Sequence, residues 1–412
     1  MNKMEKIIEI SKIICRKDLY PRFELNQEII ERYSGSIEYL PPIKINQDNI
    51  LIDGFHRVKA HQFAEIKEIK AEIINTESEK ELIKLAYQWN SSHGLQLKKE
   101  EKQKFAREMI GVMTVQEIAE VLSVIDRTIE LWTETQREAL EKEQERIIIE
   151  HYLKAENTQE KIAEILNIPR QTITDKIKNF AEKRKISEIG ETFNPLLYNI
   201  WSIQKDSKTE RFGHFPQVFM ENLIYYHTEL FDVIYDPFAG YGTTIDVCKK
   251  WYRRYYCSDL VVMAGREDDI KERSIQQGIP KELKKPDLVF LDPPYWKQAK
   301  GKYSKLDSDL GNMELEDFYK TFETFLKELI RWKVYRIAIV IAPTQYPNKN
   351  HEFEDHIFKF NQILSSKYQI EMRYVIPYST EQYNGTQVEI MKKEKKPLNL
   401  IRDLVIWALK KE

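Results

Sequence analysis

The sequence predicts a chain of three parts: an α+β segment, an all-α segment and an α/β domain of Rossmann-like architecture. Over about the first ninety residues, short β-branched runs alternate with helical stretches. From about 98 to 185 the chain is charged, Leu/Ile-periodic and almost free of Gly and Pro, which predicts helices. After 190, apolar runs alternate with helical stretches, which is typical of a doubly wound sheet. We therefore expect domains at 1–88, 89–190 and 191–412.

Composition narrows the class of protein only slightly. The 412 residues are 42% hydrophobic and 32% charged, enough for ordinary buried cores. No run approaches the roughly 18 apolar residues of a membrane span, and the first residues lack the apolar core of a secretory signal. The cysteines (Cys15, Cys248 and Cys257) have no metal-ligand spacing, so we expect no metal, no disulfide and a cytoplasmic location. The net charge of -2 neither favours nor excludes a nucleic-acid partner.

The helical region contains an internal repeat. Thr114–Leu122 and Thr158–Leu166 both read Thr, Gln-Glu, Ile-Ala-Glu and Leu, and each is followed by a small polar turn and a second helix. Ala119 and Ala163 stand where two helices cross closely, as in a helix-turn-helix. The alternative is plain packing of paired helices, but the doubling and the polar second helices favour DNA contact. The predicted DNA-binding residues are Arg127, Arg170, Gln171, Thr172 and Lys176.

A Gly-rich turn follows the first predicted strand of the α/β domain. Val233-Ile234-Tyr235 runs into Asp236-Pro237-Phe238-Ala239-Gly240-Tyr241-Gly242-Thr243-Thr244. Such a strand-turn-helix allows a ligand to approach backbone N–H groups closely. The spacing is neither the dinucleotide fingerprint nor the phosphate loop, so it suits an uncharged or zwitterionic ligand. Asp236 is placed to accept a hydrogen bond from a ligand ammonium group. The predicted ligand-binding residues of the turn are Asp236, Pro237, Phe238, Gly240, Gly242 and Thr243.

Two further acidic residues end predicted strands. Asp259 follows Tyr255-Tyr256-Cys257, about 20 positions after the Gly-rich turn, where nucleotide-binding folds hold a ribose diol. The alternative is a common turn-forming Asp. Asp292-Pro293-Pro294-Tyr295 follows the strand Leu288–Leu291, and its prolines make a rigid loop. The Asp side chain and a backbone carbonyl of this loop can accept from a planar NH₂ group. Tyr295 offers a face for stacking on an extruded base.

These motifs make residues 193–412 resemble the amino-methylating class of S-adenosylmethionine-dependent DNA methyltransferases. The resemblance implies that the Gly-rich turn and Asp259 bind S-adenosylmethionine, and that Asp292, Pro293, Pro294 and Tyr295 form the catalytic loop. His214-Phe215-Pro216 is similar to the family's cofactor-side motif, which implies that Phe215 and Pro216 line the methionine pocket. An Asp at the head of the catalytic loop is typical of the family's N6-adenine enzymes. An N4-cytosine enzyme and an RNA N-methyltransferase stay open as alternatives.

Later segments extend the resemblance. Arg373–Pro377 and Arg402–Trp407 resemble the last strands of the family's sheet, and the loop Ser379–Gln387 is expected beside the active site. Tyr303–Asn312 resembles a mobile substrate-side loop. Only about fifty residues separate the Gly-rich turn from Asp292, so this interval has no room for a large recognition insert. The helix-turn-helices are therefore the expected means of choosing a DNA sequence.

The amino-terminal 135 or so residues resemble the ParB/sulfiredoxin-like superfamily. The residues that carry this resemblance are Leu19-Tyr20-Pro21-Arg22 and Leu51–Ala60, with Asn90 and His93-Gly94 downstream. In that family a Gly-x-x-Arg turn holds a nucleotide's phosphates, which implies such a contact for Arg57, whereas His56 is expected to be structural. Members bind CTP, cleave nucleic acid or act as adaptors. A ParB-like, nucleotide-gated DNA-binding regulator is therefore a further alternative.

The sequence as a whole predicts a site-specific DNA methyltransferase that modifies a flipped base, with adenine N6 as the favoured target. The expected cofactor is S-adenosylmethionine, and the expected partner is double-stranded DNA. A nucleotide at the ParB-like part, a second copy of the chain and a cognate restriction nuclease stay open. No membrane partner is expected.

Overall fold

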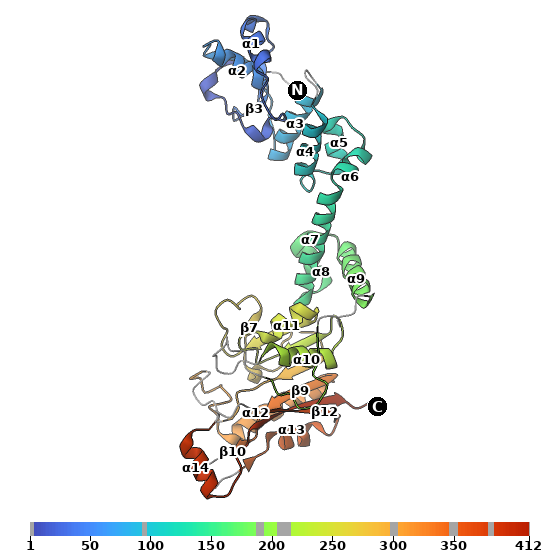
Figure 1. The fold of residues 1–412 in the computed structure, drawn as a ribbon, viewed down its shortest axis with the longest axis vertical. Coiled ribbons are helices and arrows are strands. Elements are labelled where there is room, and N and C mark those ends of the chain that lie inside the picture. The colour runs from blue at the N-terminus through green and yellow to red at the C-terminus, as the bar shows by residue number, and fades with distance from the viewer. Residues whose placement is uncertain are drawn as a thin grey trace. The chain divides into compact units, whose positions relative to one another are not determined.

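The computed structural model describes residues 4–92, 97–186, 193–203, 216–296, 304–345, 353–377 and 383–411 (Figure 1). Its contacts divide the chain into two compact units, Met1–Gln144 and Glu145–Glu412. The division falls within the helix α7 (Glu134–Leu153). The domain limits expected at 88/89 and 190/191 rest on the sequence pattern and stay predictions. No described helix is long and apolar enough to cross a membrane.

The first unit contains a four-stranded sheet of order β1-β4-β2-β3. Its strands are β1 (Met4–Glu9), β2 (Ile43–Ile45), β3 (Leu51–Asp53) and β4 (Glu68–Ile73), and the helices α1 (Gln27–Ser34) and α2 (Phe55–Phe63) pack against each other. The strands β2 and β3 pair antiparallel as a hairpin. Asn46 closes its turn, because Asn46 Oδ1 accepts hydrogen bonds from the backbone N–H groups of Asp48 (3.0 Å) and Ile50 (2.8 Å).

The two repeated sequences form helix pairs with the same local geometry. In the first unit α5 (Val115–Leu122) and α6 (Asp126–Trp132) pack with α4 (Lys99–Met109) and α3 (Glu79–Ser92). In the second unit the pair is α8 (Gln159–Leu166) and α9 (Arg170–Ile186). Thr114 and Thr158 cap the first helices, and the left-handed residues Ser123 (φ 52°) and Asn167 (φ 51°) end them. The predicted helical segment is therefore confirmed.

The second unit is built on a seven-stranded sheet of order β12-β13-β9-β8-β5-β6-β7. The strands β5 to β9 are parallel, and β13 is antiparallel to both of its neighbours. The strand order reverses at β5, which lies between β6 and β8. A ligand in such a sheet binds beyond the carboxyl ends of the strands at this reversal. The bounds are β5 (Val233–Asp236), β6 (Arg254–Asp259), β7 (Ile270–Glu272), β8 (Leu288–Leu291), β9 (Arg336–Ile341), β12 (Tyr368–Pro377) and β13 (Ile401–Leu409).

Two hydrophobic clusters cover the two faces of this sheet. Alternation along β5 assigns Ile234 to one cluster and Val233 and Tyr235 to the other. The helices α10 (Gln217–His227) and α11 (Thr243–Trp251) contribute to the first cluster, whereas α12 (Leu315–Trp332) and α13 (His356–Leu364) contribute to the second. A two-stranded ribbon, β10 (Thr344–Gln345) with β11 (Phe353–Glu354), and the helix α14 (Gly385–Lys393) complete the unit. The predicted Rossmann-like α/β fold is confirmed.

The second helix-turn-helix shares a core with the sheet. Its buried residues Ile162, Ile173 and Ile177 belong to the same cluster as the residues of α10 and α11. Arg254, the first residue of β6, donates hydrogen bonds to three carbonyl oxygens at the end of α7 and in the segment that follows it, at 2.9, 3.0 and 3.2 Å. The Ala155 N–H donates to the Tyr255 carbonyl at 2.8 Å. The helices α8 and α9 are therefore part of this unit's core and not a separately folded module.

Candidate active site

Three carboxylates end neighbouring parallel strands of the second unit. Asp236 is the last residue of β5, Asp259 is the last residue of β6, and Asp292 directly follows β8. Because β6, β5 and β8 are adjacent and parallel, their carboxyl ends meet at one edge of the sheet. The charges of Asp236 and Asp259 both raise the pKa of Asp292. The structure therefore brings the three sequence-predicted carboxylates together at the reversal of strand order.

The Gly-rich turn is organised around the side chain of Asp236. Its Oδ1 accepts from the Phe238 N–H at 2.9 Å, and its Oδ2 accepts from the Thr244 hydroxyl at 2.5 Å. Gly242 has a φ of 86°, and a Cβ there would lie 3.0 Å from the guanidinium carbon of Arg266. Only glycine fits this position without a shift of Arg266. Gly242 is therefore packed closely against Arg266 at the start of α11, and the role of the turn in ligand binding stays a prediction.

Asp236 is almost completely shielded from solvent, with 1% of its surface exposed. Burial raises the pKa of Asp236 from 3.8 to about 7, against the opposing effect of the hydrogen bonds from Thr244 and Phe238. The nearby charge of Asp259 raises this pKa further. A cation bound at the turn would stabilise the ionised carboxylate.

Asp259 joins β6 to the Gly-rich turn. Its Oδ2 accepts from the Gly240 N–H at 2.7 Å, and its Oδ1 accepts from the Val261 N–H at 3.3 Å. Burial raises the pKa of Asp259, backbone hydrogen bonds lower it, and the charge of Asp309 raises it. Asp309 lies in the predicted substrate-side loop, where it accepts from the N–H and the hydroxyl of Ser304, both at 3.0 Å. The described part of this loop, Ser304–Asn312, therefore lies close to the strand end at Asp259.

The loop that begins at Asp292 is held partly buried. Pro293 is buried, whereas Asp292, Pro294 and Tyr295 keep some exposed surface. Burial raises the pKa of the Asp292 carboxyl well above its usual range, and the Arg402 guanidinium and a hydrogen bond with Tyr295 oppose this shift. Arg402 lies on β13 and follows Asp292 by more than a hundred positions. Sequence reasoning assigned Arg402 to a strand and missed its electrostatic effect on the loop.

A chain of hydrogen bonds fixes the end of the same loop at Trp296. The Trp296 indole N–H donates to the Met313 carbonyl at 2.9 Å, and the Thr344 hydroxyl lies 3.4 Å from the Trp296 carbonyl oxygen. Thr344 also contacts Nε2 of the fully buried His356 at 2.8 Å. Nδ1 of His356 contacts the Tyr319 hydroxyl at 2.8 Å. No sequence signal connects these residues, because each stands in a different element.

Two predicted site segments, His214–Pro216 and Ser379–Gln387, lie partly outside the described residues. Phe215 lies outside them, and Pro216 directly precedes α10 with part of its surface exposed. The predicted loop Ser379–Gln387 is described only from position 383, where its residues lead into and begin α14. Pro237 is buried, and Phe238 and Thr243 are partly buried in the Gly-rich turn. Within the described ranges no group of His, Cys, Asp and Glu has the arrangement of a metal site.

The residues predicted to contact DNA have local partners of their own. Arg170 pairs with Glu160 at 2.9 Å, Gln171 donates to Asp175 at 2.9 Å, and Arg127 pairs with Glu130 at 3.2 Å. Thr172 and Lys176 are partly buried on α9. DNA binding through these helices would have to replace these ion pairs by contacts with DNA. The role of the helices in DNA binding stays a prediction.

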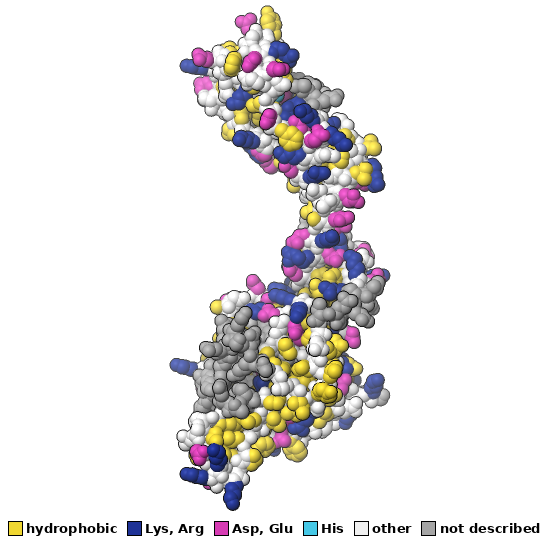
Figure 2. Space-filling model, viewed as in Figure 1, with side chains coloured by type: hydrophobic (Ala, Val, Ile, Leu, Met, Phe, Trp, Pro, Cys, Tyr) yellow, Lys and Arg dark blue, Asp and Glu magenta, His cyan; other side chains and the backbone are white. Residues whose placement is uncertain are grey.

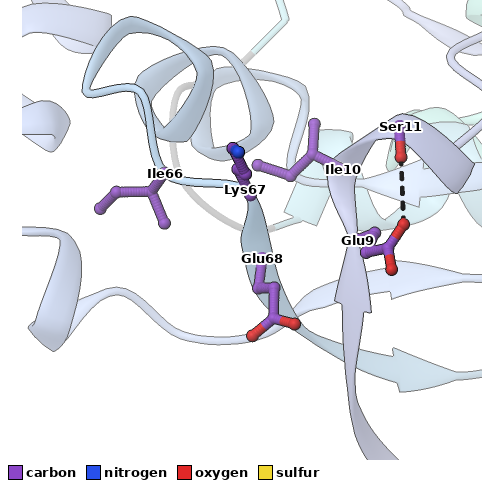
Figure 3. Close-up of a pocket in the computed structure, with 6 residues that line it drawn as sticks. All are labelled: Glu9, Ile10, Ser11, Ile66, Lys67 and Glu68. Carbon is purple, nitrogen blue, oxygen red and sulfur yellow. Dashed lines mark hydrogen bonds between the residues drawn. The ribbon is translucent and has the colours of Figure 1, made fainter.

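Arg57, the predicted phosphate ligand of the first unit, is also engaged. It donates to the carbonyl oxygens of Pro41 (2.9 Å) and Pro42 (2.6 Å) and pairs with Asp53 at 2.6 Å. The neighbouring Nε2 of His56 accepts from the Asn26 N–H at 3.1 Å. An open hollow of about 620 Å³ lies between the end of β1 and the start of β4, lined by Glu9, Ile10, Ser11, Ile66, Lys67 and Glu68 (Figure 3). None of the predicted functional residues lines this hollow.

Comparison with protein families supports a methyltransferase. Residues 61–261 match the family N6_N4_Mtase, described as DNA methylase. The matched range contains the Gly-rich turn and Asp259 and ends before Asp292. A comparison with curated proteins found no match.

Solved structures resemble parts of the chain at low sequence identity. A Pnob8-like ParB-N domain is 18% identical over 29% of this chain and 49% of that one, with a TM-score of 0.25. An rRNA methylase from Streptococcus thermophilus is 13% identical over 49% and 100%, with a TM-score of 0.29. The 1,6-didemethyltoxoflavin-N1-methyltransferase of Burkholderia thailandensis, solved with S-adenosylhomocysteine, is 11% identical over 47% and 78%, with a TM-score of 0.31. The chain thus spans about half the length of the first of these proteins.

Proposed function

We propose that the chain transfers a methyl group from S-adenosylmethionine to N6 of a flipped adenine in duplex DNA, because residues 61–261 match the DNA methylase family N6_N4_Mtase. The observation that carries this proposal is the convergence of Asp236, Asp259 and Asp292 on one edge of the sheet. The first two belong to the part of the chain that matches the family, and the third heads a rigid Pro-Pro loop. N4 of cytosine is the competing target.

The chemistry of the site fits S-adenosylmethionine. This cofactor carries an ammonium group, a sulfonium and a ribose diol, and when bound it supplies an electrophilic methyl group. Burial raises the pKa of Asp236 to about 7, and the pKa of Asp259 is raised as well, so the site stabilises bound positive charge. Asp236 would hold the ammonium group through its carboxylate. Asp259 would hold the ribose hydroxyls while it keeps its hydrogen bond from Gly240.

Asp292 is the residue that would act on the target amine. Its carboxyl oxygen accepts a hydrogen bond from one N–H of the base, and a carbonyl of the Pro-Pro segment accepts from the other. Both bonds raise the electron density on nitrogen, and Asp292 then accepts the proton that the methylated amine loses. Arg402 opposes the burial that raises the pKa of Asp292, and so favours the ionised form that this role requires. Tyr295 would stack on the extruded base.

We expect α8 and α9 to contribute to the choice of DNA sequence. Their shared core with the catalytic sheet supports this role, because it would hold α9 at a constant position relative to Asp292. Arg170 and Gln171 would then exchange their acidic partners for DNA groups. The Arg170→Ala variant should lose discrimination between DNA sites and keep its affinity for S-adenosylmethionine.

Transfer of a radiolabelled methyl group from S-adenosylmethionine to duplex DNA tests the function. We expect labelled N6-methyladenine from the wild type, and at least a hundredfold slower transfer from Asp292→Ala. The matched control is Asp317→Asn, an exposed position on α12 that should keep wild-type activity. Calorimetry should find S-adenosylmethionine bound by both variants. Label on cytosine alone would overturn the adenine assignment, and label on RNA but not on DNA would overturn the substrate class.

A further inference from the structure

A lysine-rich segment connects β12 to β13. Residues 383–400 form α14 and the return of the chain to the sheet, and they include Lys392, Lys393, Lys395 and Lys396. Figure 1 labels α14, and Figure 2 shows that Lys and Arg side chains gather over this helix. Lys392 pairs with Glu389 at 2.9 Å on the same helix. The other three are exposed and form no ion pair with any described side chain.

Reciprocal hydrogen bonds hold this segment against the ribbon that follows β9. Gln345 Nε2 donates to the Pro397 carbonyl at 2.9 Å, and the Asn399 N–H donates back to Gln345 Oε1 at 3.0 Å. The Tyr383 hydroxyl donates to the Asn399 carbonyl at 2.8 Å, which joins the two ends of the segment. Met391, on α14, is 1% exposed and anchors the helix. The lysines are therefore carried by a fixed part of the unit.

Two connections lead from the carboxyl-terminal end of the segment to the catalytic loop. Gln345, which bonds Pro397 and Asn399, directly follows Thr344, whose hydroxyl lies 3.4 Å from the carbonyl oxygen of Trp296 at the end of the loop. The segment then enters β13, where Arg402 lowers the pKa of Asp292. The chain leaves β12 and enters β13 at the same edge of the sheet at which Asp292 lies, because β9 and β12 run parallel there. The lysines thus stand beside the catalytic edge.

The charges of this edge create a requirement for such cations. Asp236, Asp259 and Asp292 converge there, and each of these carboxyls that is ionised repels a polyanion that must bring its base to this edge. The net charge of the whole chain is -2, so it gives no general attraction for DNA. Lysines held at the rim supply attraction where the duplex has to be bound. The same lysines also stabilise the carboxyl end of α14, and thermal unfolding distinguishes this effect from DNA binding.

We propose that Lys393, Lys395 and Lys396 bind phosphates of the DNA backbone beside the target base. This inference rests on the proposed function and names the part of the chain that binds the substrate's backbone. Because phosphates carry no sequence information, these contacts strengthen binding to every duplex alike. Removal of the lysines is expected to raise the KM for DNA and leave methyl transfer at saturating DNA unchanged.

The test compares two triple variants of the full chain. K393Q/K395Q/K396Q removes three charges at the catalytic edge. K367Q/K410Q/K411Q removes three exposed charges next to the start of β12 and the end of β13, at the opposite edge of the sheet. Binding of a labelled mixed-sequence duplex of about 30 base pairs is measured from low to physiological salt. Methyl transfer and thermal unfolding are measured on the same samples.

For the first variant we expect at least tenfold weaker binding at low salt. Its slope of log affinity against log salt should be smaller by about 2 to 3, since each phosphate contact contributes about 0.9. The control should match the wild type. Equal slopes and equal KM values for the two variants would overturn the proposal, and so would a loss explained by unfolding of the first variant alone. A wild type that binds DNA with this salt dependence but methylates none would instead refute the proposed function.

Discussion

The buried charge of Asp236 should lower the stability of the free protein, and Asp236→Asn tests this expectation. Burial raises the pKa of this carboxyl from 3.8 to about 7, so the folded protein binds the proton more tightly than the unfolded chain. The loss of stability caused by the buried charge is absent below the pKa of the unfolded chain. It grows as the pH rises from 3.8 to about 7 and is complete above that value. A shift of about three units corresponds to roughly 4 kcal/mol.

The amide of the variant carries no charge, and its single oxygen keeps only one of the two hydrogen bonds that Asp236 accepts, from the Thr244 hydroxyl or from the Phe238 N–H. Its NH₂ group needs a new partner, and a buried group without one costs about 1–3 kcal/mol. We therefore expect the variant to be about 1–3 kcal/mol more stable than the wild type at pH 8. At pH 4 it should be less stable by about the cost of that unpaired group. The free energy of unfolding from urea titrations, followed by the signal of the second unit at several pH values, measures the difference.

Asp246→Asn is the matched control on the same helix, α11. Asp246 pairs with Arg266 at 2.7 Å, and half of its side chain is exposed, so its removal should change stability by less than about 1 kcal/mol. The gain should appear in Asp236→Asn alone and only above pH 5, with a loss of affinity for S-adenosylmethionine. A difference between Asp236→Asn and the wild type that does not vary with pH would refute the reasoning, because it would mean that Asp236 is ionised throughout.

Three further changes test separate parts of the second unit. Arg254→Gln removes bonds to three carbonyl oxygens and should speed amide hydrogen exchange in α8 and α9, with the affinity for S-adenosylmethionine unchanged. His356→Asn breaks the contact with Thr344 and should lower kcat for methyl transfer about tenfold with KM unchanged, whereas a fall in unfolding temperature alone would mean a purely structural role. Asp309→Asn removes a charge that raises the pKa of Asp259, so the fall in cofactor affinity on acidification should move to lower pH; titration calorimetry across the pH range measures it.

The three carboxylates could be found from sequence because each one ends a strand. Val233–Tyr235 and Leu288–Leu291 are continuous apolar runs, typical of parallel strands covered on both faces. Once such strands are parallel, their carboxyl ends share an edge, so Asp236 and Asp292 must lie on the same side of the sheet. The repeated helix pairs were equally accessible, since the caps Thr114 and Thr158 are local signals.

The residues that support the site from other elements could not be found from the sequence. Arg402 lies close enough to lower the pKa of Asp292 only because β13 inserts antiparallel between β9 and β12. That insertion depends on pairing between segments that are distant in the sequence. His356 contacts Tyr319 and Thr344 from a third element, with no spacing in the sequence that links them. Arg170 illustrates the reverse case, because a basic residue on a polar helix predicts DNA contact while the structure pairs it with Glu160.

The shared core of the second helix-turn-helix limits how the DNA specificity proposed for it could change. Ile173 and Ile177 of α9 are buried in the cluster that also covers the face of β5 and β6. Arg254 fixes the approach to α8 from the strand that ends in Asp259. A substitution on the exposed face of α9 leaves these contacts intact, whereas replacement of the whole helix pair would uncover apolar surface of the catalytic sheet. We therefore expect that substitutions at exposed residues such as Arg170 and Gln171 can change the target sequence. Exchange of the whole pair α8 and α9 should destabilise the catalytic fold.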